Sequence, residues 1–278
     1  MRDTLMRVLL ATGGPGQTEI AIHQLMLLAQ STPVSPTVLT VIKHAEEQQE
    51  GDEILAHAAR SLDPVLTNVQ YITRIGQPWE EIVREGDTGN YDLIMMGQRV
   101  SRPLLSRIRG LVTQKVVART SLSVLIAKRE ARPLHRILIC DSGAQSPSLL
   151  KLFSMHLPAI LKGATDVTVL HVMSQISAAP GVRGEDLQYT AEQLIESGAP
   201  EGAILEKDLD YLKPMEVELH AKVRHGLVVD EIVDEARSDD YDLVVIGVHR
   251  DARLPRFLLN DLAHELVLDV GRAILVVR

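Results

Sequence analysis

The strongest constraint in the sequence is an internal repeat. The segment YDLIMMG at residues 91–97 recurs as YDLVVIG at residues 241–247, which is an offset of 150 positions. The same offset relates SVLI at residues 123–126 to AILV at residues 273–276. Similarity at a fixed offset indicates that one structural unit occurs twice. The second half should therefore adopt whatever fold the first half adopts.

The offset is shorter near the N-terminus, where VLL at residues 8–10 matches ILI at residues 137–139, 129 positions later. The second half therefore carries about twenty extra residues in its middle. The turn-forming residues within 177–202 favour that segment as the insertion. We predict a first domain over residues 1–130 and a second domain over residues 134–278.

Each half has the pattern of an α/β domain with a parallel sheet. Short aliphatic runs alternate with amphipathic stretches, which is typical of β-α-β units. Aromatic residues make up only 3% of the chain, and an aliphatic core is typical of parallel sheets that are buried on both faces. Helical spacing of apolar residues predicts helices that include 18–30 and 79–85. The predicted strands are 6–12, 37–43, 68–74, 92–97 and 122–128, then 135–141, 167–173, 216–224, 242–247 and 272–277.

Composition argues against several classes of function. The 29 Lys and Arg residues against 37 Asp and Glu residues give a net charge of −8, so we expect no nucleic-acid partner. No apolar stretch reaches the ~18–20 residues that span a bilayer, so we expect no membrane partner. A single cysteine, Cys140, excludes an internal disulfide. That cysteine count and the lack of a leader pattern favour the cytoplasm. The histidines show no ligand-spaced pair, so we expect no metal.

Both halves resemble the universal stress protein family. The resemblance rests on the order of strands and helices, on Tyr-Asp-Leu followed by three apolar residues and Gly, and on the closing strands SVLI and AILV. It implies, in each half, a doubly wound five-stranded sheet of order 3-2-1-4-5, like that of adenine nucleotide alpha hydrolases. It also implies that the last strands pair, so that the two domains form an internal pseudo-dimer. An open apolar edge strand invites aggregation, which favours the same pairing; a homodimer is a further assembly to test.

ATP-binding members of that family carry Gly-x₂-Gly-x₉-Gly-(Ser/Thr) after the fourth strand and an Asp after the first. Such glycines let the backbone approach a phosphate, and the N–H groups of the next helix hold the anion. In the first half Gly97 and Gly110 match the first and third glycines, whereas Val100 and Leu111 replace the second glycine and the hydroxyl residue. Gly13 stands where the family has its Asp.

The second half departs further from the family pattern. Only Gly247 is present, and the remaining positions hold Arg250, Asn260 and Asp261. An acid near the start of a helix opposes a phosphate there. Asp141 follows the first strand of this half, one place early in a gapless match. We therefore do not expect ordinary ATP binding in either half.

Arginines cluster in the loop after the fourth strand of the first half. Arg99, Arg102, Arg107 and Arg109 occur there without an acid between Gly97 and Gly110. One hypothesis is that their forked side chains bind an anion in place of the glycine cradle. The alternative is that they are solvated or pair with acids of the other half. If an adenine nucleotide binds, the resemblance implies the residues Thr12, Gly13, Val41, Gly97, Arg99, Gly110, Val112 and Thr113.

We expect a regulatory or ligand-responsive module of the universal stress type that needs no cofactor and acts through an unknown protein partner. One alternative is a sensor of ATP or another adenine nucleotide that uses the first-half residues. A second alternative is a slow ATP hydrolase. The sequence has no Gly-x-Ser-x-Gly elbow and no partner set for Cys140, which reads as a small buried hydrophobic residue. We therefore predict no catalytic residue.

Overall fold

The computed structural model describes residues 5–13, 16–98, 106–128, 131–143, 147–173, 189–215, 217–247 and 256–278, with only the backbone at 106–111 and 256–261. The first half holds β1 (Met6–Ala11), α1 (Gln17–Ser31), β2 (Val34–Ile42), η1 (Ala45–Glu47), α2 (Gln48–Leu62), β3 (Gln70–Ile75), α3 (Pro78–Thr88), β4 (Leu93–Gly97), α4 (Ser106–Arg119) and β5 (Ser123–Ala127). The second half holds β6 (Arg136–Cys140), α5 (Leu149–His156), α6 (Pro158–Lys162), β7 (Asp166–Met173), α7 (Ala191–Ser197), α8 (Pro200–Leu212), η4 (Lys213–Met215), β8 (Glu218–His225), α9 (Val228–Ser238), β9 (Leu243–Gly247), α10 (Arg256–Asp269) and β10 (Ala273–Val277).

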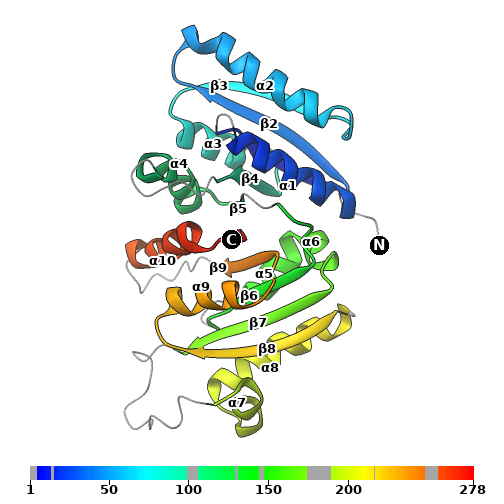
Figure 1. Cartoon of the computed structure of the whole chain (residues 1–278), viewed down its shortest axis with the longest axis vertical. Coiled ribbons are helices and arrows are strands. Elements are labelled where there is room, and N and C mark those ends of the chain that lie inside the picture. Colours follow the sequence, from blue (N-terminus) through cyan, green and yellow to red (C-terminus); the bar gives the residue numbers. More distant parts are fainter. Residues whose placement is uncertain are drawn as a thin grey trace.

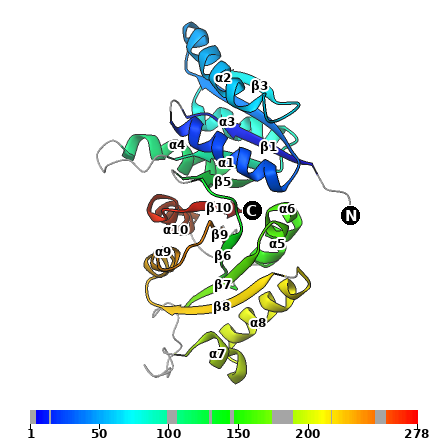
Figure 2. The same ribbon diagram turned by 45° about the vertical axis from the view of Figure 1, so that its right-hand side comes forward.

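These strands form one continuous sheet in the order β3-β2-β1-β4-β5-β10-β9-β6-β7-β8. Neighbouring strands are parallel within each half, and the order 3-2-1-4-5 of the first half is mirrored in the second. The halves join where β5 and β10 pair antiparallel, with Leu125 opposite Leu275. Figure 1 shows the two halves stacked along the long axis of the molecule, and Figure 2 labels β5 and β10 between them. The predicted fold is thereby confirmed, including the pairing of the halves as a pseudo-dimer.

Helices cover both faces of the sheet (Figures 1 and 2). α1, α2, α5, α6, α7 and α8 pack into one apolar core, and α3, α4, α9 and α10 pack into the other. Along β1, Val8 and Leu10 enter the first core and Leu9 enters the second, each 0% exposed. Burial on both faces explains why the strands read as unbroken apolar runs. Within the part of the chain that the structure describes, no helix is both long and apolar enough to cross a membrane.

The second half is extended between β7 and β8, where α7 and α8 stand in place of the single helix α2. Thr190 and Gln193 form a capping box that starts α7, and Gly198 ends it with a φ of +68°. Pro200 then opens α8, since a proline at the first turn gives up no helical hydrogen bond. Residues 174–188, and with them the first part of the predicted insertion 177–202, lie outside the described residues.

Two equivalent residues tie the halves together just beyond β5 and β10. The buried Lys128 donates from Nζ to the carbonyl of Val267 in α10 at 2.5 Å. Arg278 donates from its guanidinium to the carbonyl of Val117 in α4. Lys128 and Arg278 are 150 positions apart in the sequence, as are Val117 and Val267. These contacts therefore obey the pseudo-two-fold symmetry of the repeat.

The aspartate of the repeated Tyr-Asp motif has a structural role in both halves. Asp92 accepts from the backbone N–H of Arg7 at 2.8 Å and also from its guanidinium. Asp242 accepts from the backbone N–H of Arg136 at 2.9 Å. Each aspartate thereby fixes the start of the fourth strand of its half against the start of the first. The motif that reveals the repeat is part of the scaffold and lies at the amino ends of the strands.

Candidate functional site

A cavity of about 200 Å³ lies in the second half at the carboxyl ends of β6, β7 and β9. Doubly wound sheets bind ligands at this edge, beside the point where the strand order reverses. One end of the cavity is polar, and the other walls are aliphatic. The aliphatic walls are formed by Leu149, Leu170, Val172, Val228, Ile232, Ile246 and Leu262.

The polar end of the cavity is formed by Cys140, Asp141 and Ser142. The register of the sheet places Cys140 between Leu170 of β7 and Ile246 of β9. The backbone N–H of Asp141 donates to the carbonyl of Leu170 at 3.2 Å, which extends the strand pairing one residue beyond β6. The end of β6 and the residues after it therefore place Cys140, Asp141 and Ser142 together in the lining of an otherwise apolar cavity, and a few polar residues in an apolar lining are typical of a small-molecule site.

Asp141 is only 3% exposed. Its Oδ1 accepts from the backbone N–H of Gly143 at 2.7 Å, and its carbonyl oxygen lies 3.1 Å from Nδ1 of His171. Its Oδ2 has no hydrogen-bond partner within the described residues. A buried acceptor with an unused oxygen is uncommon in proteins. Asp141 is therefore the most conspicuous polar group of the site.

Cys140 contributes surface to the cavity but no reactive thiolate. Burial raises the pKa of this thiol far above its usual range, and the charges of Glu235 and Asp141 act in the same direction. A thiol that stays protonated is a weak nucleophile. Cys140 is partly exposed and lines the cavity, whereas the sequence predicted a buried hydrophobic residue.

Three residues predicted for a nucleotide site in the first half lie at the equivalent edge, where Thr12 and Gly13 follow β1 and Gly97 ends β4. The hydroxyl of Thr12 donates to the carbonyl of Leu39 at 3.1 Å. A Cβ on Gly97 would collide with the carbonyl of Gln17, where α1 begins, and a Cβ on Gly13 would collide with the Gln17 side chain. The two glycines thus make room for the start of α1, which explains structurally why glycine stands at both positions.

Four further predicted residues contact the scaffold or lie within it. Val41 of β2 and Val112 of α4 are partly buried and pack against the core on the α3–α4 face. Thr113 is 6% exposed. Gly110 lies inside α4, because that helix begins at Ser106. The N–H groups that open this helix therefore come before Gly110 in the sequence and not after it.

The side chains of the arginine-rich loop in the first half lie outside the described residues. Arg99 and Arg102 lie outside the described residues, and of Arg107 and Arg109 the structure describes only the backbone in α4. The hypothesis that these arginines bind an anion therefore stays a prediction.

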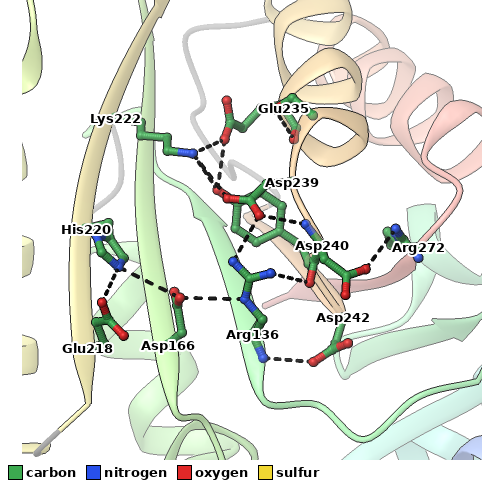
Figure 3. A network of polar contacts seen from close by, with 12 residues as sticks. Arg136, Asp166, Glu218, His220, Lys222, Glu235, Asp239, Asp240, Asp242 and Arg272 are labelled. Atoms are coloured by element: carbon green, nitrogen blue, oxygen red, sulfur yellow. Dashed lines mark hydrogen bonds and ion pairs between the residues drawn. The ribbon is translucent and has the colours of Figure 1, made fainter.

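Figure 3 shows a network of ion pairs that includes three side chains able to ligate a metal. Ligand atoms of Asp166, Glu218 and His220 lie within 4.8 Å of one another, and no other such group occurs among the residues described. Arg136, however, places its Nε 3.6 Å from Oδ2 of Asp166. Because the Arg136 guanidinium already lies beside the Asp166 carboxylate, we interpret the three residues as part of the ion-pair network and not as a metal site.

The buried centre of this network is Glu235 of α9, whose side chain is 3% exposed. It accepts from Lys222 Nζ at 2.7 Å, from Arg224 Nε at 2.6 Å and from the Tyr241 hydroxyl at 2.8 Å. Glu85 is the equivalent carboxylate of the first half. The tyrosine of the repeated motif therefore supports the scaffold, as the aspartate does.

Sequence reasoning placed its candidate residues in the first half and missed the cavity of the second. The available signal was Asp141, an acid that directly follows a predicted strand. The aliphatic walls gave no signal, because Val172 and Ile232 look like any core residue in the sequence. Asp208 of α8, which faces Asp141, stands where the first half has Ala58 of α2, 150 positions earlier.

Comparison with known proteins places the chain in a family. A profile of the universal stress protein family matches residues 4–128 and again residues 134–278. A universal stress protein of Archaeoglobus fulgidus has a similar structure, with a TM-score of 0.72 at 15% identity over 98% of this chain and 96% of that one. A Pseudomonas aeruginosa protein assigned to the universal stress proteins superposes with a TM-score of 0.70 at 18% identity over 99% and 94% of the two chains.

A second Pseudomonas aeruginosa protein, of unknown function, has a TM-score of 0.65 at 18% identity over 99% of this chain and 93% of that one. No curated protein matches the sequence significantly. At these identities the structural likenesses show the fold alone, whereas the profile covers both halves. The chain belongs to the universal stress protein family, with two such domains in tandem.

Proposed function

We propose that this protein is a regulatory, ligand-responsive binding module without catalysis, and that its ligand lies in the second-half cavity. The observation that carries the proposal is the composition of this cavity. It has aliphatic walls, and three consecutive polar or weakly polar residues, Cys140, Asp141 and Ser142, lie together in its lining. Such a site binds an apolar body through its walls and orients that body through the few polar residues of its lining.

The size of the cavity favours a base or a nucleoside over a nucleoside triphosphate. An aliphatic cavity of about 150 Å³ is large enough for benzene. At about 200 Å³ the present cavity has room for a purine ring but not for a whole ATP molecule. Asp141 and Ser142 would then face hydrogen-bond donors and acceptors of the ring.

The sequence beside the cavity argues against a phosphate cradle. After Gly247 the family positions hold Arg250, Asn260 and Asp261 in place of two glycines and a hydroxyl residue. Asp261 belongs to α10, and a carboxylate near the amino end of a helix competes with a phosphate for the same positive potential. We therefore expect phosphate groups to add nothing to the affinity.

Two alternatives make different predictions. An adenine-nucleotide sensor that uses the first half needs phosphate contacts from the loop between Gly97 and Gly110, and a slow ATP hydrolase needs measurable turnover. The absence of a required cofactor, a protein partner that reads the ligand state, and a cytoplasmic location remain parts of our proposal. A pull-down compared with and without ligand would test the partner.

The test is calorimetric titration of the full chain with adenosine, AMP and ATP with magnesium. A ligand of adenosine's size that contributes about −0.3 kcal/mol per non-hydrogen atom binds with a Kd on the order of tens of micromolar. We expect adenosine to bind in this range and ATP to bind no more tightly. Ile232→Phe fills the cavity and should abolish binding. Ile82→Phe changes the equivalent residue of the first half and should leave binding intact, since both isoleucines are buried alike, at 3% and 2% exposed.

Two results would contradict the proposal. ATP binding at least tenfold tighter than adenosine, weakened by Arg99→Ala and by Ile82→Phe but not by Ile232→Phe, would place the site in the first half. Neither heat nor a thermal shift at millimolar adenosine would exclude a nucleoside-like ligand in the cavity. ATP turnover above background would instead support the hydrolase.

A further inference from the structure

An acid lies on the buried face of α8. Asp208 is 3% exposed, and the neighbouring positions on this face are Leu205 and Leu212, both 0% exposed. An isolated charge on such a face is strongly unfavourable, so a buried carboxyl is either paired or protonated. At the repeat offset of 150 positions the matching residue of α2 is the buried Ala58, so this acid is specific to the second half.

The carboxyl group that Asp208 faces is that of Asp141. Burial raises the pKa of Asp208 to about 7, and the charge of Asp141 together with a hydrogen bond between the two groups acts in the same direction. The Oδ2 atoms of both residues are buried and without another partner in the described part of the chain. Two carboxyl groups in contact cannot easily both ionise, and a single proton between them satisfies both oxygens.

The surroundings offer little to neutralise a second negative charge. Lys207 on α8 itself lowers the pKa of Asp208, but less than the other causes raise it. His171 of β7 contacts the carbonyl of Asp141 and not its carboxyl group. Cys140 of β6 keeps its proton. β8 contributes Leu219, Ala221 and Val223 to the core beneath α8, and by strand alternation His225 ends the same face, with its Nε2 3.4 Å from the carbonyl of Tyr189. α7 contributes apolar side chains there. The shared proton is therefore the main means of holding the two acids together.

The same region joins α8 to the polar end of the cavity. Gly143, in the loop between β6 and α5, has a φ of +68°, and a Cβ there would collide with Ile204 of α8. Asp141 accepts from the N–H of Gly143 through its other oxygen. The loop that carries Asp141 and Ser142 is thus held against α8 by one tight apolar contact and by the acid pair.

We propose that Asp141 and Asp208 share one proton, and that this proton fastens the β6–α5 loop to α8 in the geometry that binds ligand. The part that concerns ligand rests on the function proposed above, whereas the part that concerns the proton does not. Above neutrality the proton is lost, the two carboxylates repel each other, and the loop is released. Binding linked to one proton weakens by up to about tenfold per pH unit in that range.

The proton is tested by NMR of ¹³C-labelled aspartate carboxyl groups in the full chain between about pH 5 and pH 9, a range far above the usual aspartate pKa. We expect one aspartate signal to titrate near neutrality in the wild type. It should vanish in both Asp208→Asn and Asp141→Asn. Asp210→Asn is the matched control on the same helix, because Asp210 is exposed and pairs with Lys213; the signal should persist there. Absence of any aspartate titrating above about pH 5.5 would overturn the proposal.

Fastening is tested by hydrogen exchange of the α8 amides at about pH 6 and pH 8, corrected for intrinsic rates. In the wild type the equilibrium constant for the opening of α8 should rise by up to about tenfold per pH unit. In Asp208→Asn it should be independent of pH, because the amide can donate to Asp141 at any pH. Equal opening at both pH values in the wild type would contradict the fastening.

Adenosine titrations at the same two pH values complete the test. The wild type should bind more weakly at the higher pH, whereas Asp208→Asn should bind equally at both. Binding by the wild type that is independent of pH would overturn the link to ligand. No binding at either pH, with the NMR and exchange results as expected, would refute the proposed function and the ligand link but leave the shared proton established.

Discussion

Removal of the carboxylate of Glu235 should destabilise the second half about twice as much as the equivalent change in the first. Glu235→Ala leaves the hydroxyl of Tyr241 buried without its acceptor and separates Lys222 and Arg224 from a carboxylate that is 3% exposed. Loss of one partner from a buried ion pair costs about 3–5 kcal/mol. Because the side chains of Lys222 and Arg224 are 39% and 29% exposed, water recovers part of this cost. We therefore expect about 3 kcal/mol.

Glu85→Ala is the matched control. Glu85 is 14% exposed, and its partner Arg74 is 46% exposed. A more solvated pair contributes less, and with the loss of the Tyr91 hydrogen bond the expected cost is about 1–2 kcal/mol. Urea unfolding at neutral pH, followed by hydrogen exchange to separate the halves, measures both values. Equal losses, or a larger loss in Glu85→Ala, would refute this account of the network.

The same substitution has a predictable dependence on pH. Burial alone would raise the pKa of Glu235, but hydrogen bonds from Lys222, Arg224 and Tyr241 outweigh burial and hold the pKa below its usual value. Because the folded-state pKa is lowered, the charged carboxylate stabilises the fold fully at pH values above the pKa of the unfolded chain. This stabilisation is lost as the pH falls through the folded-state pKa. The difference between the wild type and Glu235→Ala should therefore shrink on acidification below about pH 4.5. A stability difference between the two proteins that stays constant down to about pH 3 would contradict a stabilising negative charge on Glu235.

Two further substitutions test the tight contacts of the fold. Gly143→Ala should lower the free energy of unfolding by about 1–3 kcal/mol, because the left-handed φ is strained for alanine and the new methyl meets Ile204. Adding Ile204→Ala should recover part of this loss in thermal unfolding. An unchanged stability of Gly143→Ala would contradict the packing. Lys128 is 2% exposed, and burial lowers its pKa to about 8. A lowered lysine pKa means that stability rises between about pH 8 and pH 10, where the unfolded chain holds more protons. Relative to Lys128→Met, the wild type should therefore gain up to about 3 kcal/mol over this range, and a constant difference would contradict the burial of the charge.

Much of the fold was predictable because a repeat fixes two domains at once. The unbroken apolar runs are the direct result of burial on both faces, and the edge strands around Leu125 and Leu275 had to find partners. The boundary of β2 was less predictable. This strand starts at Val34, and Pro36 lies within it opposite Val8. The strand predicted from the sequence, 37–43, begins one residue after this proline, which cannot donate to the ladder.

The candidate site was predictable only in outline. The correct edge of the sheet follows from topology, but the contacts made there by the first helix of each half do not. Gln17 closes against Gly97 in the first half, and no local pattern announces that contact. Asp208 could not be paired with Asp141, since their partnership depends on the placement of a helix within a connection of unknown path.

The location of the ligand site is tested most directly by methyl NMR of the full chain during titration with adenosine. Val172 of the second half and Val41 of the first hold equivalent positions on β7 and β2, and only Val172 lines the cavity. We expect shifts at Val172 and Ile246 that saturate with one equivalent of ligand, and unchanged signals at Val41. Shifts centred on Val41, with Val172 and Ile246 unmoved, would show that the first half binds the ligand and would contradict our account.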